Sequence, residues 1–180
     1  MAYSFPEGAS FYFSSTFAGA KTVTVASNAN PCLATSVSHG YSDGDVVLFN
    51  SGWEDATDSC YVVDQQSADT FLLTGLNSSN TTFYPATPGT GSAYAVSSWV
   101  QIPQVLTIGT SGGDARFTNI SPLSRRNSIA IPTGFNAASI TLSLGHDPDD
   151  ANYLSMLDVS RALTKVAFKM TLGGGGTTYG

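Results

Sequence analysis

Few side chains in this sequence could carry chemistry, and none of them lies in a catalytic pattern. The chain of 180 residues has only two histidines, His39 and His146. A catalytic histidine needs a nucleophile or an acid within hydrogen-bonding reach, but the sequence contains no nucleophile elbow, phosphate-binding glycine loop or zinc-binding helix motif. We therefore interpret both histidines as loop or capping residues, and we expect no enzymatic activity and no cofactor.

The two cysteines, Cys32 and Cys60, are too few for a disulfide-stabilised scaffold. No cluster of histidine and cysteine has the spacing of metal ligands. Two interpretations stay open. Both thiols are free and packed as small apolar groups, or they form one disulfide, which requires an oxidising compartment.

The densest group of carboxylates is Asp147, Asp149 and Asp150. Such a group could bind calcium, but the glycine and the distant glutamate of an EF-hand loop are missing. The same residues suit the start of a helix, because Asp147 is a good N-cap, Pro148 is tolerated at the first helical position, and negative charge is favoured in the first turn. We predict a helix from 148 to about 160 and no metal site.

The rest of the chain favours short β-strands separated by Gly, Pro, Asn and Asp. The predicted strands cover residues 21–26, 45–50, 60–64, 70–74, 98–108, 138–145 and 162–172. Within 138–145, Ile140, Leu142 and Leu144 alternate with serine and threonine, which is typical of a half-buried antiparallel strand. Residues 110–127 are predicted to form a long loop, although FTNI (117–120) could pair locally, and the glycine-rich end, 173–180, is predicted to be flexible.

The composition favours association over catalysis or nucleic-acid binding. Charged residues make up 11% of the chain, against about 25% in ordinary domains. The formal net charge is −6, and no Lys or Arg occurs between Lys21 and Arg116. Such a chain is not built to hold phosphates. A surface with so few charges suits either a subunit covered by neighbours or a neutral, β-rich extracellular domain.

The N-terminal residues lack the basic and apolar regions of a signal peptide, and no apolar run has the length of a membrane span. We therefore expect a protein that is made and assembled in a cytoplasm.

Two segments resemble a known family. In SITLSLGHDPDDANYLSMLDVSRALTKVAFKM, a strand leads through a DPDD helix start into a short helix and another strand, and this order resembles the tail tube proteins of siphophages. The phrases SHGYSDGDVVLFNSGW and CYVVDQQSADTFLLTGL look like a small β module of the ubiquitin-activating-enzyme-like type that recurs as an insertion in phage tail proteins.

The resemblance implies a mainly β protein: an antiparallel β-sandwich or barrel of the tail-tube type with one short α-helix (about 148–160) and an inserted small all-β module. Residues 1–19 and 96–180 are expected to form the discontinuous tail-tube core. Residues 20–95 are expected to form the inserted module, on the outer face.

The resemblance further implies a structural virion protein that assembles with itself. Its copies would close into hexameric rings, and the rings would stack into a tube through which double-stranded DNA passes without specific binding. The implied partners are the tape measure, tail terminator and baseplate proteins. Candidate contacts between rings join basic and acidic residues: Arg116, Arg125, Arg126, Asp149, Asp150 and Asp158.

Two alternatives stay open at this point. One is another virion part, such as a tail terminator, a baseplate protein or a decoration protein. The other is a carbohydrate-binding or adhesin β module, which would need clustered exposed aromatic residues.

Overall fold

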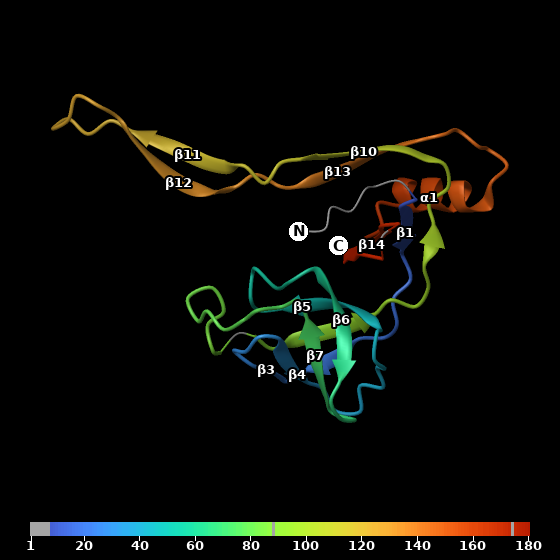
Figure 1. The fold of residues 1–180 in the computed structure, drawn as a ribbon. Helices are drawn as coiled ribbons and strands as arrows, with labels where there is room; N and C mark the ends of the chain where they lie inside the picture. Colours follow the sequence, from blue (N-terminus) through green and yellow to red (C-terminus); the bar gives the residue numbers. More distant parts are fainter. Residues whose placement is uncertain (1–7, 88, 174) are drawn as a thin grey trace. The chain divides into compact units, whose positions relative to one another are not determined.

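The computed structural model describes residues 8–87, 89–173 and 175–180, and these form two compact units. The first unit, called the body here, combines the described residues up to Ile102 with Asp149–Gly180. The second, called the ribbon, is Pro103–Pro148. Both units consist mainly of antiparallel β-structure and the body carries a short helix, so the predicted fold class is confirmed (Figure 1).

Seven strands of the body form a nearly closed barrel. In the order in which they pair, they are β2 (Lys21–Val23), β8 (Gly91–Ala95), β5 (Val46–Ser51), β6 (Ser59–Gln65), β7 (Thr70–Thr74), β4 (Cys32–Thr35) and β3 (Val25–Ala26). The two edge strands, β2 and β3, follow one another directly in the chain. Between them, the Thr24 N–H donates to the Thr35 carbonyl at 2.9 Å. One short bent segment therefore pairs with both ends of the sheet, which leaves the barrel little free edge.

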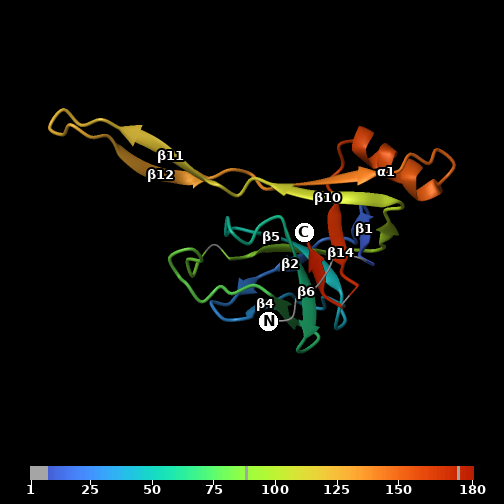
Figure 2. The same cartoon turned by 45° about the horizontal axis from the view of Figure 1, so that its top comes forward.

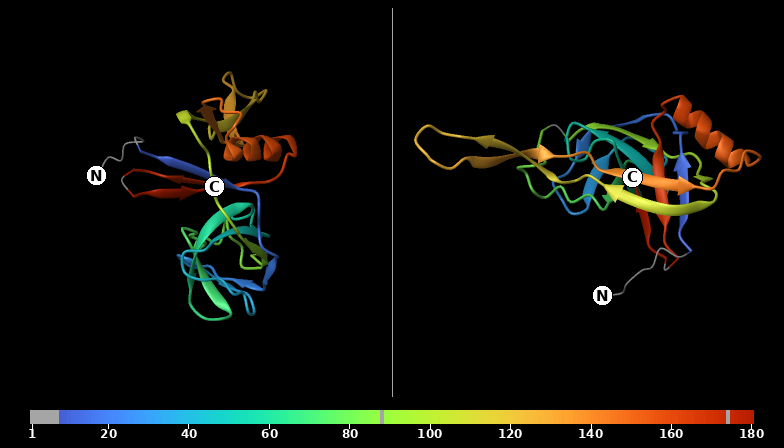
Figure 3. Two further views of the ribbon diagram at one scale, coloured as in Figure 1. Left: turned by 90° about the vertical axis from the view of Figure 1, so that its right-hand side faces the viewer. Right: turned by 90° about the horizontal axis from the view of Figure 1, so that it is seen from above.

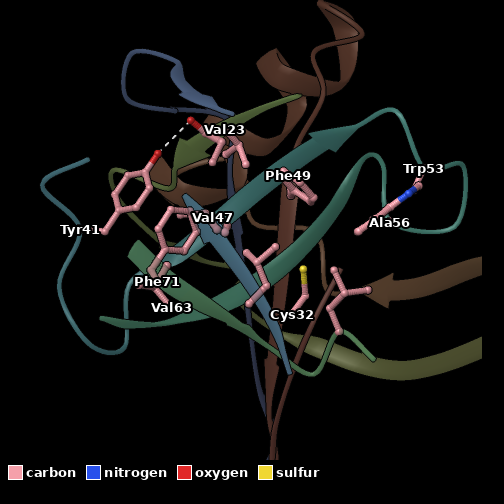
Figure 4. Packing of buried hydrophobic residues seen from close by; sticks show 13 residues of the cluster. Val23, Cys32, Tyr41, Val47, Phe49, Trp53, Ala56, Val63 and Phe71 are labelled. Atoms are coloured by element: carbon pink, nitrogen blue, oxygen red, sulfur yellow. Dashed lines mark hydrogen bonds between the residues drawn. The ribbon is translucent and has the colours of Figure 1, made fainter. Parts of the chain in front are cut away.

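Alternating apolar residues fill this barrel. Phe49, Phe71 and Leu73 are completely buried, and Figure 4 shows Phe49 and Phe71 in this core. Trp53 lies in the connection after β5, and its indole N–H donates to the Pro85 carbonyl at 2.7 Å. A Cβ at Gly91 would lie 1.9 Å from the Asn50 carbonyl oxygen. Only glycine therefore allows β8 to approach β5 this closely.

A smaller sheet in the body joins the two ends of the chain. It pairs β15 (Thr177–Tyr179), β14 (Ala167–Thr171), β1 (Ser10–Ser14) and β9 (Val100–Gln101), in that order. The prediction of a flexible C-terminus is wrong for Thr177–Tyr179, because these residues pair with β14. The predicted strand over 162–172 is also too long, since the preceding helix ends only at Arg161 and the strand begins at Ala167.

Helix α1 (Ala151–Arg161) begins later than predicted. Its N-cap is Asp150, whose carboxylate accepts from the N–H groups of Asn152 at 2.7 Å and Tyr153 at 3.0 Å. The prediction that Asp147 caps the helix is wrong, because the Asp147 carboxylate accepts a hydrogen bond from the Gln104 side chain at 2.9 Å. Asp149 precedes the cap and so lies outside the first turn.

The second unit is a long two-stranded ribbon (Figures 2 and 3). Its inner half pairs β10 (Val105–Ser111) with β13 (Ser139–Leu144), and its outer half pairs β11 (Ala115–Ile120) with β12 (Ile129–Phe135). The predicted loop at 110–127 therefore contains the end of β10 and the whole of β11, and only residues 112–114 and 121–127 lie outside strands. The predicted strand at 98–108 is two strands, β9 and β10, because Pro103 cannot donate to a ladder.

Candidate functional site

The ribbon exposes large apolar side chains without a core beneath them. None of the residues of Pro103–Pro148, all of which the structure describes, is buried. The large apolar side chains that are exposed on it are Leu106, Phe117, Ile120, Leu123, Ile129, Ile131, Phe135 and Ile140. Two isolated strands are at best marginally stable in water, and exposed apolar patches of this size mark interaction sites. The ribbon therefore requires a covering surface.

The inner half of the ribbon is apolar on one face only. Ile108 lies opposite Leu142, and Thr110 lies opposite Ile140. The other face carries only small or polar residues, since Thr107 lies opposite Ser143, Gly109 opposite Thr141, and Ser111 opposite Ser139. The alternation predicted for 138–145 is thus present. It suits a strand pair with one face against a neighbour and one face in water.

The outer half of the ribbon is apolar on both faces. Phe117 lies opposite Pro132 on one face, while Ile120 lies opposite Ile129 on the other, where Ile131 also points. Phe117 is 60% exposed and Ile131 is 42% exposed. A ribbon with apolar side chains on both faces can remove them from water only between two surfaces. The local pairing allowed for FTNI is present, but the partner strand β12 was not predicted, although IAIPTGF contains β-branched and aromatic residues that favour strands.

The candidate charged residues are divided between the two units. Arg116 lies on β11, and Arg125 and Arg126 lie in the loop between β11 and β12. Asp150 caps α1, and Asp158 on α1 forms an exposed ion pair with Arg161 at 3.6 Å.

One face of the small sheet carries an aromatic cluster around a lysine. Lys169 lies opposite Tyr12 on β1 and opposite Tyr179 on β15. Its Nζ lies 4.4 Å from the centre of the Tyr12 ring and 4.8 Å from that of Trp99. Cation–π contacts of this length hold the ammonium group against the sheet, so its charge is partly covered.

His39 is buried rather than placed in an open loop. It is 1% exposed, and its ring packs against the rings of Tyr41 and Phe71. Its Nδ1 accepts from the Tyr41 N–H at 3.0 Å, which leaves Nε2 to donate to the Ser67 carbonyl at 3.0 Å. Both ring nitrogens are thus used in structure.

Tyr41 gives the barrel a pH dependence that can be measured. Its hydroxyl donates to the Ala93 carbonyl at 2.9 Å, and burial, reinforced by the Asp45 carboxylate, raises the Tyr41 pKa from 10.0 to about 12. The folded state therefore keeps this proton between pH 10 and 12, where the unfolded state releases it. The stabilisation is complete below that window and is lost as the pH rises through it.

We predict that Tyr41→Phe makes the unfolding free energy less sensitive to alkaline pH. As the pH rises from 10 to 12, the unfolding free energy of the wild-type protein should fall by about 2–3 kcal/mol more than that of the variant. Urea unfolding at pH 9 and at the upper end of the window measures it, and each protein is compared with itself, because the lost hydrogen bond lowers stability at every pH. Equal losses in both proteins would contradict the assignment.

The remaining candidates for chemistry form no site. Cys32 and Cys60 are free thiols, and burial raises the pKa of each. Among the described residues, no group of three or more His, Cys, Asp or Glu is arranged to hold a metal ion. No helix in the described part of the chain has the length and hydrophobicity needed to cross a membrane.

Comparison with known proteins identifies one family. The model of the family described as phage tail tube protein, TTP, matches residues 51–180. The match covers more than half of the chain. It begins at the last residue of β5, inside the barrel, and includes the whole ribbon. No curated protein and no solved structure matches the chain.

Proposed function

The chain belongs to the phage tail tube protein family, and we propose that its copies close into hexameric rings that stack into the tube of a siphophage tail. The protein is a structural component of the virion tail, not an enzyme, and proteins of this family assemble with themselves. The observation that carries the proposal is the ribbon, whose outer half has apolar side chains on both faces and no covering surface.

Ring closure uses the small sheet in this proposal. Among the described residues, β15 and β9 are its edge strands, and each leaves one side without a partner strand. Pairing the β15 edge of one copy with the β9 edge of the next would join the sheets into one barrel around a channel, which removes exposed edges. The contact is heterologous and closes by rotation, whereas stacking of rings is open-ended.

The channel has to let double-stranded DNA pass without holding it. Each Lys or Arg that contacts a phosphate adds affinity. If the small sheet lines the channel, its Lys169 is held between the Tyr12 and Trp99 rings and is poorly placed for phosphate contacts. We propose that the tape measure protein sets the tube length, and that the terminator and baseplate proteins close the ends.

We propose that the barrel is an inserted module on the outer face of the tube, and that the tube is assembled in the host cytoplasm. Support comes from the continuity of the barrel strands, all of which lie between Lys21 and Ala95. The acidic character of this segment fits an outward position, since it holds Lys21 as its only Lys or Arg.

Charged contacts are proposed to join successive rings. Arg116, Arg125 and Arg126 form the basic side, and Asp149, Asp150 and Asp158 offer acidic partners on a neighbour. A single exposed ion pair contributes about 0–1 kcal/mol. Because each pair would occur six times in every ring, the ion pairs together would stabilise the stacking of rings.

We predict that Arg125→Glu combined with Arg126→Glu shortens or abolishes tubes and leaves the fold intact. Both residues lie in an exposed loop, so the melting temperature should not change. Tube length in micrographs and sedimentation of the purified protein measure the effect. Lys21→Glu, which adds negative charge outside the ribbon, is the control. Tubes of normal length from the double variant would refute the role of these arginines.

A further inference from the structure

An unfilled pocket lies on the outside of the barrel, within the body. Its volume is about 430 Å³. The apolar part of its lining comes from Leu48 and Tyr94 on the barrel strands β5 and β8, and from Phe17, Ala18 and Ala20 in the segment that leads into β2. The pocket is large enough for an apolar side chain of leucine size, and its walls match one chemically.

An acidic turn lies beside the pocket. Lys165, which lines the pocket, forms an ion pair with Asp58 at 2.6 Å. Asp58 ends the turn that contains Glu54 and Asp55, and all three carboxylates are exposed. This turn carries more negative charge than the single lysine neutralises, so it would attract a basic partner.

The ribbon ends in a segment with the complementary properties. This tip, residues 121–128, has the sequence SPLSRRNS, which contains two arginines and no carboxylate. Leu123 in the tip is fully exposed. The Arg125 N–H donates to the Pro122 carbonyl at 3.0 Å, which closes a turn and presents the leucine and the arginines together.

We propose that the tip of one copy inserts Leu123 into the barrel pocket of a second copy. Arg125 and Arg126 then face Glu54 and Asp55 in the acidic turn beside the pocket, and these carboxylates take the place of the helix aspartates as their partners. This contact rests on the proposed self-assembly and gives the barrel a role in it, as a socket between subunits. The helix carboxylates Asp149 and Asp158 remain as partners for Arg116, which lies on the ribbon outside the tip.

Disulfide trapping in assembled protein tests the contact. Leu123→Cys and Ala20→Cys place a thiol on the tip and one at the exposed wall of the pocket. A chain that carries both substitutions has one tip and one socket, so mild oxidation is expected to give a ladder of multimers on a non-reducing gel. Mixing the two single variants is expected to stop the ladder at dimers.

The controls separate this contact from chance collisions. Each single variant alone, and Leu123→Cys combined with Thr74→Cys on the exposed end of β7, is expected to give no ladder. A disulfide within one chain, or an equal ladder from the Thr74 pair, would overturn the proposal. So would the absence of cross-links in protein that has formed tubes.

A second pair of variants gives a readout without oxidation. Leu123→Asp places a charge in the apolar pocket and is expected to raise the concentration needed for assembly at least tenfold, whereas Leu123→Met should assemble normally. Assembly of Leu123→Asp at the wild-type concentration overturns the socket and leaves the proposed tube intact. A wild-type protein that never assembles overturns the tube, and the socket with it.

Discussion

Phe117→Asp and Ile131→Asp, each made alone, are expected to keep the purified chain monomeric. The two residues project from opposite faces of the outer ribbon and are both exposed in the single chain. Burying one large apolar side chain contributes about 1.5–3 kcal/mol, and burying an unpaired carboxylate in its place adds a desolvation cost. A loss of about 3 kcal/mol per contact corresponds to roughly a hundredfold weaker association.

The prediction requires that a substitution on either face of the outer ribbon weakens assembly. If the ribbon lies between two surfaces, neither substitution is tolerated. Thr141→Asp, on the Ser/Thr face of the inner half, is the matched control and should assemble. Sedimentation velocity measures association, and the melting temperature shows that each variant is folded. Normal assembly of either outer-face variant would mean that its face stays in water.

Phe71→Ala is expected to have the largest effect on stability. Phe71 lies in the centre of the barrel, is completely buried, and contacts the rings of His39 and Tyr41. Truncating a buried phenylalanine costs about 3–5 kcal/mol, because the neighbouring side chains cannot close the cavity. Such a loss is a large share of the 5–15 kcal/mol that holds a typical domain folded.

The same substitution on the ribbon provides the control. Phe117→Ala removes a side chain that is 60% exposed, so the unfolding free energy should change by less than about 0.5 kcal/mol. Chemical unfolding measured by tryptophan fluorescence follows the barrel, since Trp53 is part of its core. Equal effects of the two substitutions would show that the ribbon is packed in the single chain.

Part of the barrel could be predicted from local sequence patterns, but no predicted strand covered β4 or β8, and the predicted strand at 21–26 is two strands, β2 and β3. The predicted strands at 60–64 and 70–74 agree closely with β6 and β7, because short β-branched and aromatic runs between turn residues already specify strands that alternate between core and water. The prediction for His39 was wrong because it also relied on the local pattern alone. Its neighbours suggest a turn, and only the fold reveals that the rings of Tyr41 and Phe71 enclose it.

The ribbon and the C-terminus could not be predicted in this way. Gly112 and Gly113 suggest a loop, and both do adopt positive φ between β10 and β11, but the two-stranded ribbon resumes after them instead of ending there. Thr177–Tyr179 is too short and polar to predict a strand, and only pairing with β14 orders it. In both cases the pairing is set by residues distant in sequence. The predicted helix start was wrong because of a tertiary contact too, since the Gln104 side chain donates a hydrogen bond to the Asp147 carboxylate.

Which charged residues contact one another is the feature of the molecule that is hardest to predict from sequence. The arginines of the ribbon were found by sequence because basic residues are rare in this chain. Their partners depend on how copies meet, which no pattern within one chain encodes. The pocket beside Asn50 has no sequence signature, because its walls come from four separate segments.

Electron microscopy of the purified, full-length chain is the most direct test of the central claim that its copies build a tube. We predict six-fold rings in end views and striated tubes in side views, with a width on the order of 100 Å for six domains of this size around a channel. A protein that remains monomeric at high concentration, or that forms closed particles without stacking, would contradict it.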